Sequence, residues 1–165
     1  MVNQMKNSKQ NKFELFFLPK DQKTVNKFKI FLDYLIKLYP NLFTSTKKNI
    51  KPLALNIRYQ IRDEFKKQNL DVFLKFWNQY NYTFLRWYTH NNYYFLACIR
   101  NKYRYNLDGS ISSELTVEHK DYACNLLKAN CEKLFNRDPE KFLKNKFILF
   151  ASRQIMNYEN SKKDI

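Results

Sequence analysis

The sequence is poor in the residue types on which many catalytic and cofactor sites depend. It contains one glycine, two histidines and three cysteines in 165 residues. A single glycine leaves no glycine-rich phosphate loop, and no HExxH, GxSxG or zinc-ligand spacing is present. These absences exclude the usual signatures of P-loop nucleotidases, serine hydrolases and zinc proteins.

The cysteines do not form a disulfide framework. Cys98, Cys124 and Cys131 make no CxxC pair, and one is left over in any pairing. Cys124 and Cys131 lie two turns apart on an expected helix, about 10 Å along its axis and too far for a disulfide. We therefore expect three small buried thiols in a reducing compartment.

Long apolar runs are also missing. The longest, such as residues 147–151, are far shorter than the roughly 20 residues that span a bilayer. Residues 1–12 are polar and lysine-rich, without the apolar core of a signal peptide. We expect a basic N-terminal arm, a short docked strand or plug over residues 13–18, and a cytoplasmic protein.

Basic residues are what the chain has in excess. It carries 30 Lys and Arg against 15 Asp and Glu, a net charge of +15, with 44% hydrophobic and 18% aromatic residues. This composition predicts one globular domain rather than disorder. Such a charge repels itself unless a polyanion offsets it, which favours a nucleic-acid partner. An anionic membrane surface and a merely solvated basic surface are the alternatives.

Helical spacing dominates the first half of the chain. Apolar residues predict a helix over residues 25–39, with Thr24 as N-cap and Pro40 as stop. Residues 51–55 are expected to be extended because a residue before proline avoids the helical region. A second helix is predicted over residues 56–68, with one apolar face.

The middle of the chain is less regular. Residues 70–87 suit two helices, with a break and a cap at Asn78 or Asn81. Residues 93–99 and 103–107 are rich in strand-forming types and lie a hairpin-length connection apart, so they predict two paired strands.

Turn and cap residues organise the rest. Gly109, the only glycine, follows Asp108 and predicts a turn with positive φ. Thr116 is a suitable N-cap for the next helix. Asp138, followed by a proline, opens a last helix predicted over residues 139–158.

Catalysis finds little support in the sequence. A nuclease could use His90 and His119 if they converged on one phosphate. Asp108, Glu114 and Glu118 could instead hold Mg²⁺, but scattered carboxylates around a turn are a weak signal. A small basic ribonuclease is therefore the alternative function.

Nucleic-acid binding finds more support. Single-stranded nucleotides stack on aromatic side chains while cations contact the phosphates. The expected hairpin carries both kinds of residue: Tyr93, Tyr94, Arg100, Lys102, Tyr103, Arg104 and Tyr105. Any one tyrosine could equally belong to the core. Arg104 is stronger evidence, because a mid-strand arginine is costly to bury unpaired and should face an anion or solvent.

The helix that starts at Thr116 is a second candidate. Free N–H groups at a helix start favour a phosphate, and Lys120 lies one turn further on. An ordinary capped surface helix is the equally weighted alternative.

A series of short motifs resembles the RNA-binding domain of the FinO/ProQ family of bacterial RNA chaperones. The motifs are Lys51-Pro52-Leu53-Ala54-Leu55 with Ile57, Leu85-Arg86-Trp87-Tyr88-Thr89, Tyr94-Phe95, Arg104, Asn106-Leu107-Asp108-Gly109, Glu114-Leu115-Thr116, Glu118-His119 and Ala123. The resemblance covers roughly residues 31–130. It implies a mostly helical, single-domain α+β fold with a small sheet over residues 23–135. Residues 1–22 would be a basic extension, and residues 136–165 a C-terminal helix and tail.

The same resemblance implies a non-enzymatic RNA chaperone, without metal or cofactor and with no membrane partner, that is a monomer. It would bind terminator-type hairpins with a single-stranded 3′ tail in small RNAs and mRNA 3′ ends, protect them and promote RNA–RNA pairing. Tyr94 and Arg104 would line the pocket for the 3′ end. The full set of expected RNA-binding residues is Lys51, Arg58, Arg62, Arg86, Thr89, His90, Tyr94, Arg100, Lys102, Arg104, Thr116 and Lys120.

The sequence departs from the family pattern in several places. Ala54, Cys124 and Asn125 stand where other members carry basic residues, and Ser113 replaces a glycine. Cations elsewhere would compensate for these losses, namely Arg58, Arg62, Lys120 and Lys128.

Overall fold

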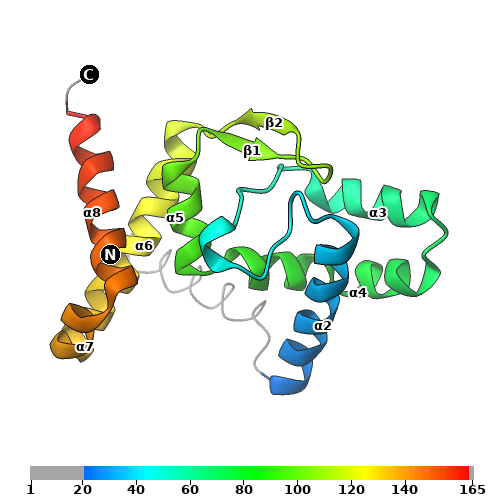
Figure 1. Cartoon of the computed structure of the whole chain (residues 1–165), viewed down its shortest axis with the longest axis horizontal. Helices are drawn as coiled ribbons and strands as arrows, with labels where there is room; N and C mark the ends of the chain where they lie inside the picture. Colours follow the sequence, from blue (N-terminus) through cyan, green and yellow to red (C-terminus); the bar gives the residue numbers. More distant parts are fainter. Residues whose placement is uncertain (1–20, 164–165) are drawn as a thin grey trace, which may run out of the picture.

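The computed structural model describes residues 21–163, so the expected arm (residues 1–12) and the apolar segment 13–18 lie outside the described residues. Its elements are α2 (Gln22–Leu38), the 3-10 turn η1 (Lys47–Asn49), α3 (Ile57–Lys67), α4 (Asp71–Thr89), α5 (Asn92–Arg100), β1 (Tyr103–Tyr105), β2 (Ile111–Glu114), α6 (Val117–Arg137), α7 (Pro139–Lys144) and α8 (Lys146–Ser161). Figure 1 shows a helical body with the β-hairpin along one edge. The predicted fold class, mostly helical α+β, is confirmed.

An aromatic cluster joins α2, α3 and α4. Phe31 of α2 stacks on Phe76 at 4.5 Å between ring centroids and meets Phe84 edge-on at 5.1 Å. Phe65 and Trp77, both buried, complete it. The helix predicted over residues 25–39 is confirmed as α2, but it starts earlier because the Asp21 carboxylate caps it, accepting from the Thr24 amide at 2.7 Å.

The expected break in residues 70–87 is wrong. The segment is one continuous helix, α4, which extends to Thr89. Asn81 does not cap a second helix. Its side-chain amide donates to the Trp77 carbonyl one turn earlier, at 2.8 Å. Because the Asn81 side chain already has a hydrogen-bond partner within the helix, it can lie in the middle of the helix.

The largest error concerns residues 93–99, which form the helix α5 and not a strand. Asn91 caps it, since its side chain accepts from the Tyr94 amide at 3.0 Å. Every residue from Tyr94 to Ile99 is buried. A helix buried on all sides shows no polar stripe, and a short apolar run of this kind is not distinguishable from a strand by periodicity.

The sheet therefore forms differently from the prediction. β1 pairs antiparallel with β2, with Arg104 opposite Ser113. Residues 51–55, extended as predicted, lie along the other edge of β1. There the Ala54 amide donates to the Tyr105 carbonyl, and the Tyr105 amide to the Pro52 carbonyl, each at 2.9 Å.

The single glycine occupies the turn between β1 and β2. Gly109 has φ of +86°, as predicted, and a Cβ built there would lie 2.6 Å from the Cβ of Asn41. Two independent constraints therefore require glycine at this position, namely the positive φ and the close approach of the loop after α2.

Gly109→Ala is expected to lower the free energy of unfolding by about 1–3 kcal/mol, because a left-handed alanine and a displaced Asn41 both cost energy. Chemical denaturation of the variant measures this. Ser110→Ala, at an exposed neighbour in the same turn, is the control and should cost less. Equal stability of Gly109→Ala and the native chain would contradict the close contact.

The C-terminal segment is two helices and not the single one predicted over residues 139–158. Asp138 caps α7 as expected, accepting from the Lys141 amide at 3.0 Å. The break falls at Asn145, whose side chain accepts from the Ile148 amide at 3.1 Å and so caps α8. α8 then lies against α5 and α6 (Figure 1).

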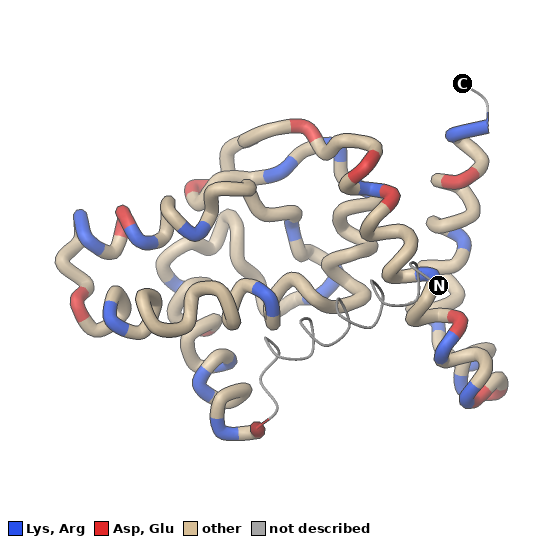
Figure 2. The backbone as a smooth tube through the Cα atoms, turned by 180° about the vertical axis from the view of Figure 1, so that it is seen from behind, with Lys and Arg blue, Asp and Glu red and all other residues tan. Residues whose placement is uncertain are grey.

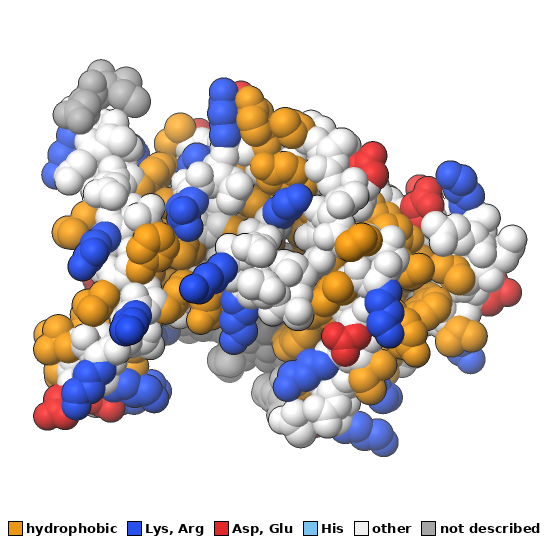
Figure 3. All heavy atoms as spheres, in the orientation of Figure 1, with side chains coloured by type: hydrophobic (Ala, Val, Ile, Leu, Met, Phe, Trp, Pro, Cys, Tyr) orange, Lys and Arg blue, Asp and Glu red, His pale blue; other side chains and the backbone are white. Residues whose placement is uncertain are grey.

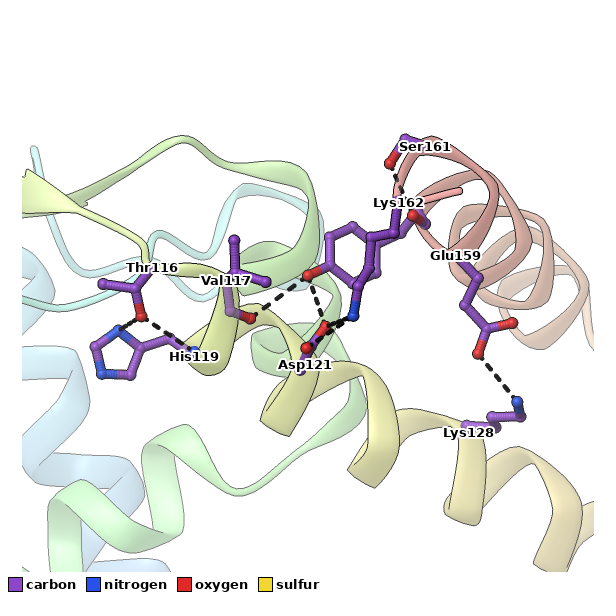
Figure 4. Close-up of polar contacts among 9 residues, drawn as sticks. Thr116, Val117, His119, Asp121, Lys128, Glu159, Ser161 and Lys162 are labelled. Carbon is purple, nitrogen blue, oxygen red and sulfur yellow. Dashed lines mark hydrogen bonds and ion pairs between the residues drawn. The ribbon is translucent and has the colours of Figure 1, made fainter. Parts of the chain in front are cut away.

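Polar contacts hold the far end of α8 to α6. The Tyr158 hydroxyl donates to the Asp121 carboxylate at 2.8 Å, and Lys162 donates to the same group at 2.7 Å (Figure 4). Hydrogen bonds from Lys162 and Tyr158 hold the pKa of Asp121 below its usual value. Lys128 and Glu159 form a further ion pair at 3.0 Å. α8 is thus fixed to the body of the protein.

None of the helices in residues 21–163 is long and apolar enough to cross a membrane. The three cysteines are free and buried, as predicted.

Candidate nucleic-acid interface

Tyr94 and Arg104 meet at one backbone segment. The Leu53 amide donates to the Tyr94 hydroxyl at 3.0 Å, and Arg104 Nη1 donates to the Leu53 carbonyl at 3.1 Å. The tyrosine belongs to α5 and the arginine to β1, and together their hydrogen bonds hold residues 51–55 in place. The two residues that the resemblance assigned to one pocket thus contact the same residue, Leu53.

The pair is not open to solvent, contrary to expectation. Tyr94 is 8% exposed and Arg104 is 9% exposed. Burial raises the pKa of the Tyr94 hydroxyl well above its usual value. The interpretation that Arg104 faces an anion or solvent is wrong for this structure, because its guanidinium is turned inward to a carbonyl. Direct contact of either residue with RNA stays a prediction.

Arg104 is nevertheless an unusual buried cation. No carboxylate among residues 21–163 forms an ion pair with it, and its Nε is buried without a hydrogen-bond partner. Burial of a charge without an opposite charge is costly.

Holding residues 51–55 places Lys51 at the surface. Its Nζ donates to the Asn41 carbonyl at 2.7 Å and lies 5.2 Å from the centre of the Tyr105 ring. Lys51 thereby ties the loop after α2 to the strand segment, and its ammonium forms one edge of a hollow.

This hollow is the basic cleft, a cavity of about 970 Å³ between the loop of residues 40–51, α5 and the start of α8. Its cations are Lys47, Lys48, Lys51, Arg100 and Lys146. No carboxylate is among its lining residues in the described part of the chain. Figure 3 shows basic side chains gathered on this face between α8 and the loop.

Aromatic rings lie beside these cations. Tyr93 and Phe147 pack with centroids 4.1 Å apart. Lys47 Nζ lies 5.1 Å from the centre of the Tyr93 ring, and the Arg100 guanidinium lies 5.2 Å from that of Phe150. Cations next to partly exposed rings are the combination that holds single-stranded nucleic acid.

A comparison with known families decides the identity of this domain. The sequence model of the ProQ/FinO family matches residues 25–140. The chain belongs to the ProQ/FinO family. Proteins of this family bind RNA, which supports RNA as the partner of the ProQ/FinO domain. No curated protein matches the chain.

Within the ProQ/FinO domain, α3 carries a second set of predicted residues. The guanidinium groups of Arg58 and Arg62 lie 4.6 Å and 5.1 Å from the centre of the Tyr59 ring. Arg62 also pairs with Asp63 at 2.9 Å. These residues do not line the basic cleft and belong to a separate surface.

The helix start at Thr116 has the features of an ordinary cap. Its side chain accepts from the His119 amide at 3.3 Å, and its hydroxyl lies 3.0 Å from His119 Nδ1. Acidic positions gather here, around the hairpin and the start of α6 (Figure 2), and Glu114 pairs with Lys102 at 3.3 Å. Lys120 lies one turn further along α6, so the helix start carries both signs of charge, and the RNA contact of Thr116 stays a prediction.

Three of the remaining predicted residues make contacts within the domain. Thr89 donates to the Leu85 carbonyl at 2.8 Å, and the His90 ring packs edge-on against Phe95 at 5.5 Å. Lys120 Nζ contacts the Ile99 carbonyl at 3.5 Å, near the end of α5. Arg86 is half-buried in α4. None of these residues lines the basic cleft.

The sequence analysis missed much of the cleft. Lys47, Lys48, Lys146 and Phe150 were not among the expected RNA-binding residues. The pair of lysines in a polar loop was a usable signal. Lys146 and Phe150 are one helical turn apart, but the sequence does not indicate that α8 packs against α5, so it gave no reason to place them at the site.

Proposed function

We propose that this ProQ/FinO-family protein captures structured RNAs that carry a single-stranded 3′ tail, and that the tail occupies the basic cleft. The observation that carries the proposal is the gathering of five cations around one cavity that no carboxylate of residues 21–163 lines. The positive potential of such a site attracts RNA phosphates at long range, and each phosphate contact releases condensed counterions.

The choice of a single strand depends on the aromatic residues. Rings stack on bases whose faces are free, and those faces are covered in a duplex. The hairpin stem would then lie outside the cleft and contact basic residues beyond it. Protection of small RNAs and promotion of RNA–RNA pairing would follow from holding their 3′ ends, in small RNAs and mRNAs alike.

Removing the 3′ tail from a hairpin RNA is expected to weaken binding at least about tenfold, because at least one stacked base and its phosphate contacts are lost. Fluorescence anisotropy with labelled hairpins, at several salt concentrations, measures this. A hairpin with an equally long 5′ tail is the control. Equal affinity for the tailed and tailless hairpins would refute the role of the tail.

The same samples test the ribonuclease alternative. No group of three His, Cys, Asp or Glu residues within residues 21–163 could hold a metal ion. The RNA recovered after hours with pure protein, with and without Mg²⁺, is expected to be intact. Ribonuclease activity that co-purifies with the protein would support the ribonuclease alternative.

A further inference from the structure

The helix α8 lies wholly beyond the part of the chain that matches the family, which ends at residue 140. Its first turns nevertheless face the family domain. Lys146, Phe147 and Phe150 line the basic cleft opposite the loop of residues 40–51. The cleft is therefore built by the ProQ/FinO domain on one side and by an added helix on the other.

We propose that the start of α8 is a nucleotide subsite, at which a base of single-stranded RNA stacks on Phe150 and its phosphate is met by Lys146 and Arg100. The subsite rests on the proposed function of the cleft and extends it to a segment outside the family domain. Its ligand class is a single-stranded ribonucleotide chain.

Exposure favours this role over simple packing. The residues of α8 that hold it to the protein, Ile148, Ala151 and Ile155, are all buried. Phe150 instead remains 39% exposed at the cavity wall, with the Arg100 guanidinium 5.2 Å from its ring centre. A partly exposed ring with an adjacent cation offers both contacts that a nucleotide needs.

Charge and size agree with a nucleotide. Lys146 is exposed and forms no ion pair with any carboxylate of the described residues, so its ammonium is available to a phosphate. The cavity of about 970 Å³ lies at the upper end of the usual range for ligand sites, about 300–1,000 Å³. A space of this size exceeds what one ion would require.

The position of α8 is also fixed before RNA arrives. Tyr93 packs on Phe147 at one end, and Asp121 holds Tyr158 and Lys162 at the other (Figure 4). The subsite thus does not depend on a helix that folds on binding.

The test uses the full chain and a hairpin with 3′ tails of increasing length. Phe150→Leu should remove the stacking face while keeping an apolar side chain, and Phe150→Tyr should keep the face. We expect Phe150→Leu to weaken binding of long-tailed RNA at least about fivefold. Its affinity for the tailless hairpin should be unchanged, and Phe150→Tyr should bind like the native chain.

Lys146→Ala gives an independent readout. It should lower the slope of log affinity against log salt by about 0.7, the value for one phosphate contact on a single strand. Lys141→Ala, at an exposed lysine of α7 outside the cleft, is the matched control and should leave the slope unchanged. Circular dichroism melting confirms that each variant is folded.

Two results would overturn the subsite. In one, Phe150→Leu and Lys146→Ala bind tailed RNA like the native chain, although cations of the loop of residues 40–51 are still needed for binding. The cleft then binds RNA without α8. In the other, the native chain binds no tailed hairpin, and the proposed function fails together with the subsite.

Discussion

Alanine at Lys47, Lys48 and Arg100 together is expected to weaken binding of tailed hairpin RNA by at least about 100-fold, since each charged hydrogen bond contributes roughly 1.5–3 kcal/mol. The three residues line the basic cleft, two of them in the loop after α2 and one at the end of α5. The slope of log affinity against log salt should fall by about 2, because each lost contact to a single strand contributes about 0.7.

The matched control also replaces three basic residues by alanine, so it has the same net charge, but the substitutions lie outside the cleft. Lys66, Lys67 and Lys75 are exposed cations at the far end of α3 and α4 and do not line the cleft. Their triple replacement by alanine should cost much less affinity. If both triple variants lose the same affinity, total charge decides binding and the cleft is not the site.

Arg104→Ala is expected to lower the free energy of unfolding by about 2–4 kcal/mol. The substitution removes a buried side chain and leaves the Leu53 carbonyl without its donor. For a chain of this size the melting temperature should fall by about 5–15 °C. Arg137→Ala, at an exposed arginine of α6, is the control and should melt within about 2 °C of the native chain.

The Arg104 position also separates support of the fold from contact with RNA. Arg104→Met keeps most of the volume and removes the charge. Measured well below its melting temperature, this variant should bind tailed RNA with only a modest loss if arginine serves to hold residues 51–55. A large loss that disappears when the 3′ hydroxyls are blocked would instead show that the guanidinium meets the RNA terminus.

Local signals in the sequence predicted much of the fold. Asp138 before a proline, Thr116 and the Asp108-Gly109 turn each lie where their chemistry requires, because caps and turns are decided by neighbouring residues. The helices α2 and α3 were evident from one-sided apolar stripes. α5 was not, since a fully buried helix has no such stripe.

The candidate site was harder to predict for a related reason. Arg104 in mid-strand indicated an exposed charge, yet the carbonyl of Leu53, 51 residues earlier in the chain, accepts a hydrogen bond from it. The cleft joins residues near 47, 100 and 146. No periodic pattern connects such distant positions, and they meet because α8 and the loop of residues 40–51 both lie against α5.

The loop that carries Lys47 and Lys48 is clamped at both ends. Near its start, Asn41 is in contact with Gly109 and accepts from Lys51, and beyond its end Leu53 is held by Tyr94 and Arg104. A ligand therefore meets ammonium groups on a backbone that is already ordered. Little backbone entropy remains to be lost on association, so bound RNA should dissociate more slowly than from a loop that orders on binding.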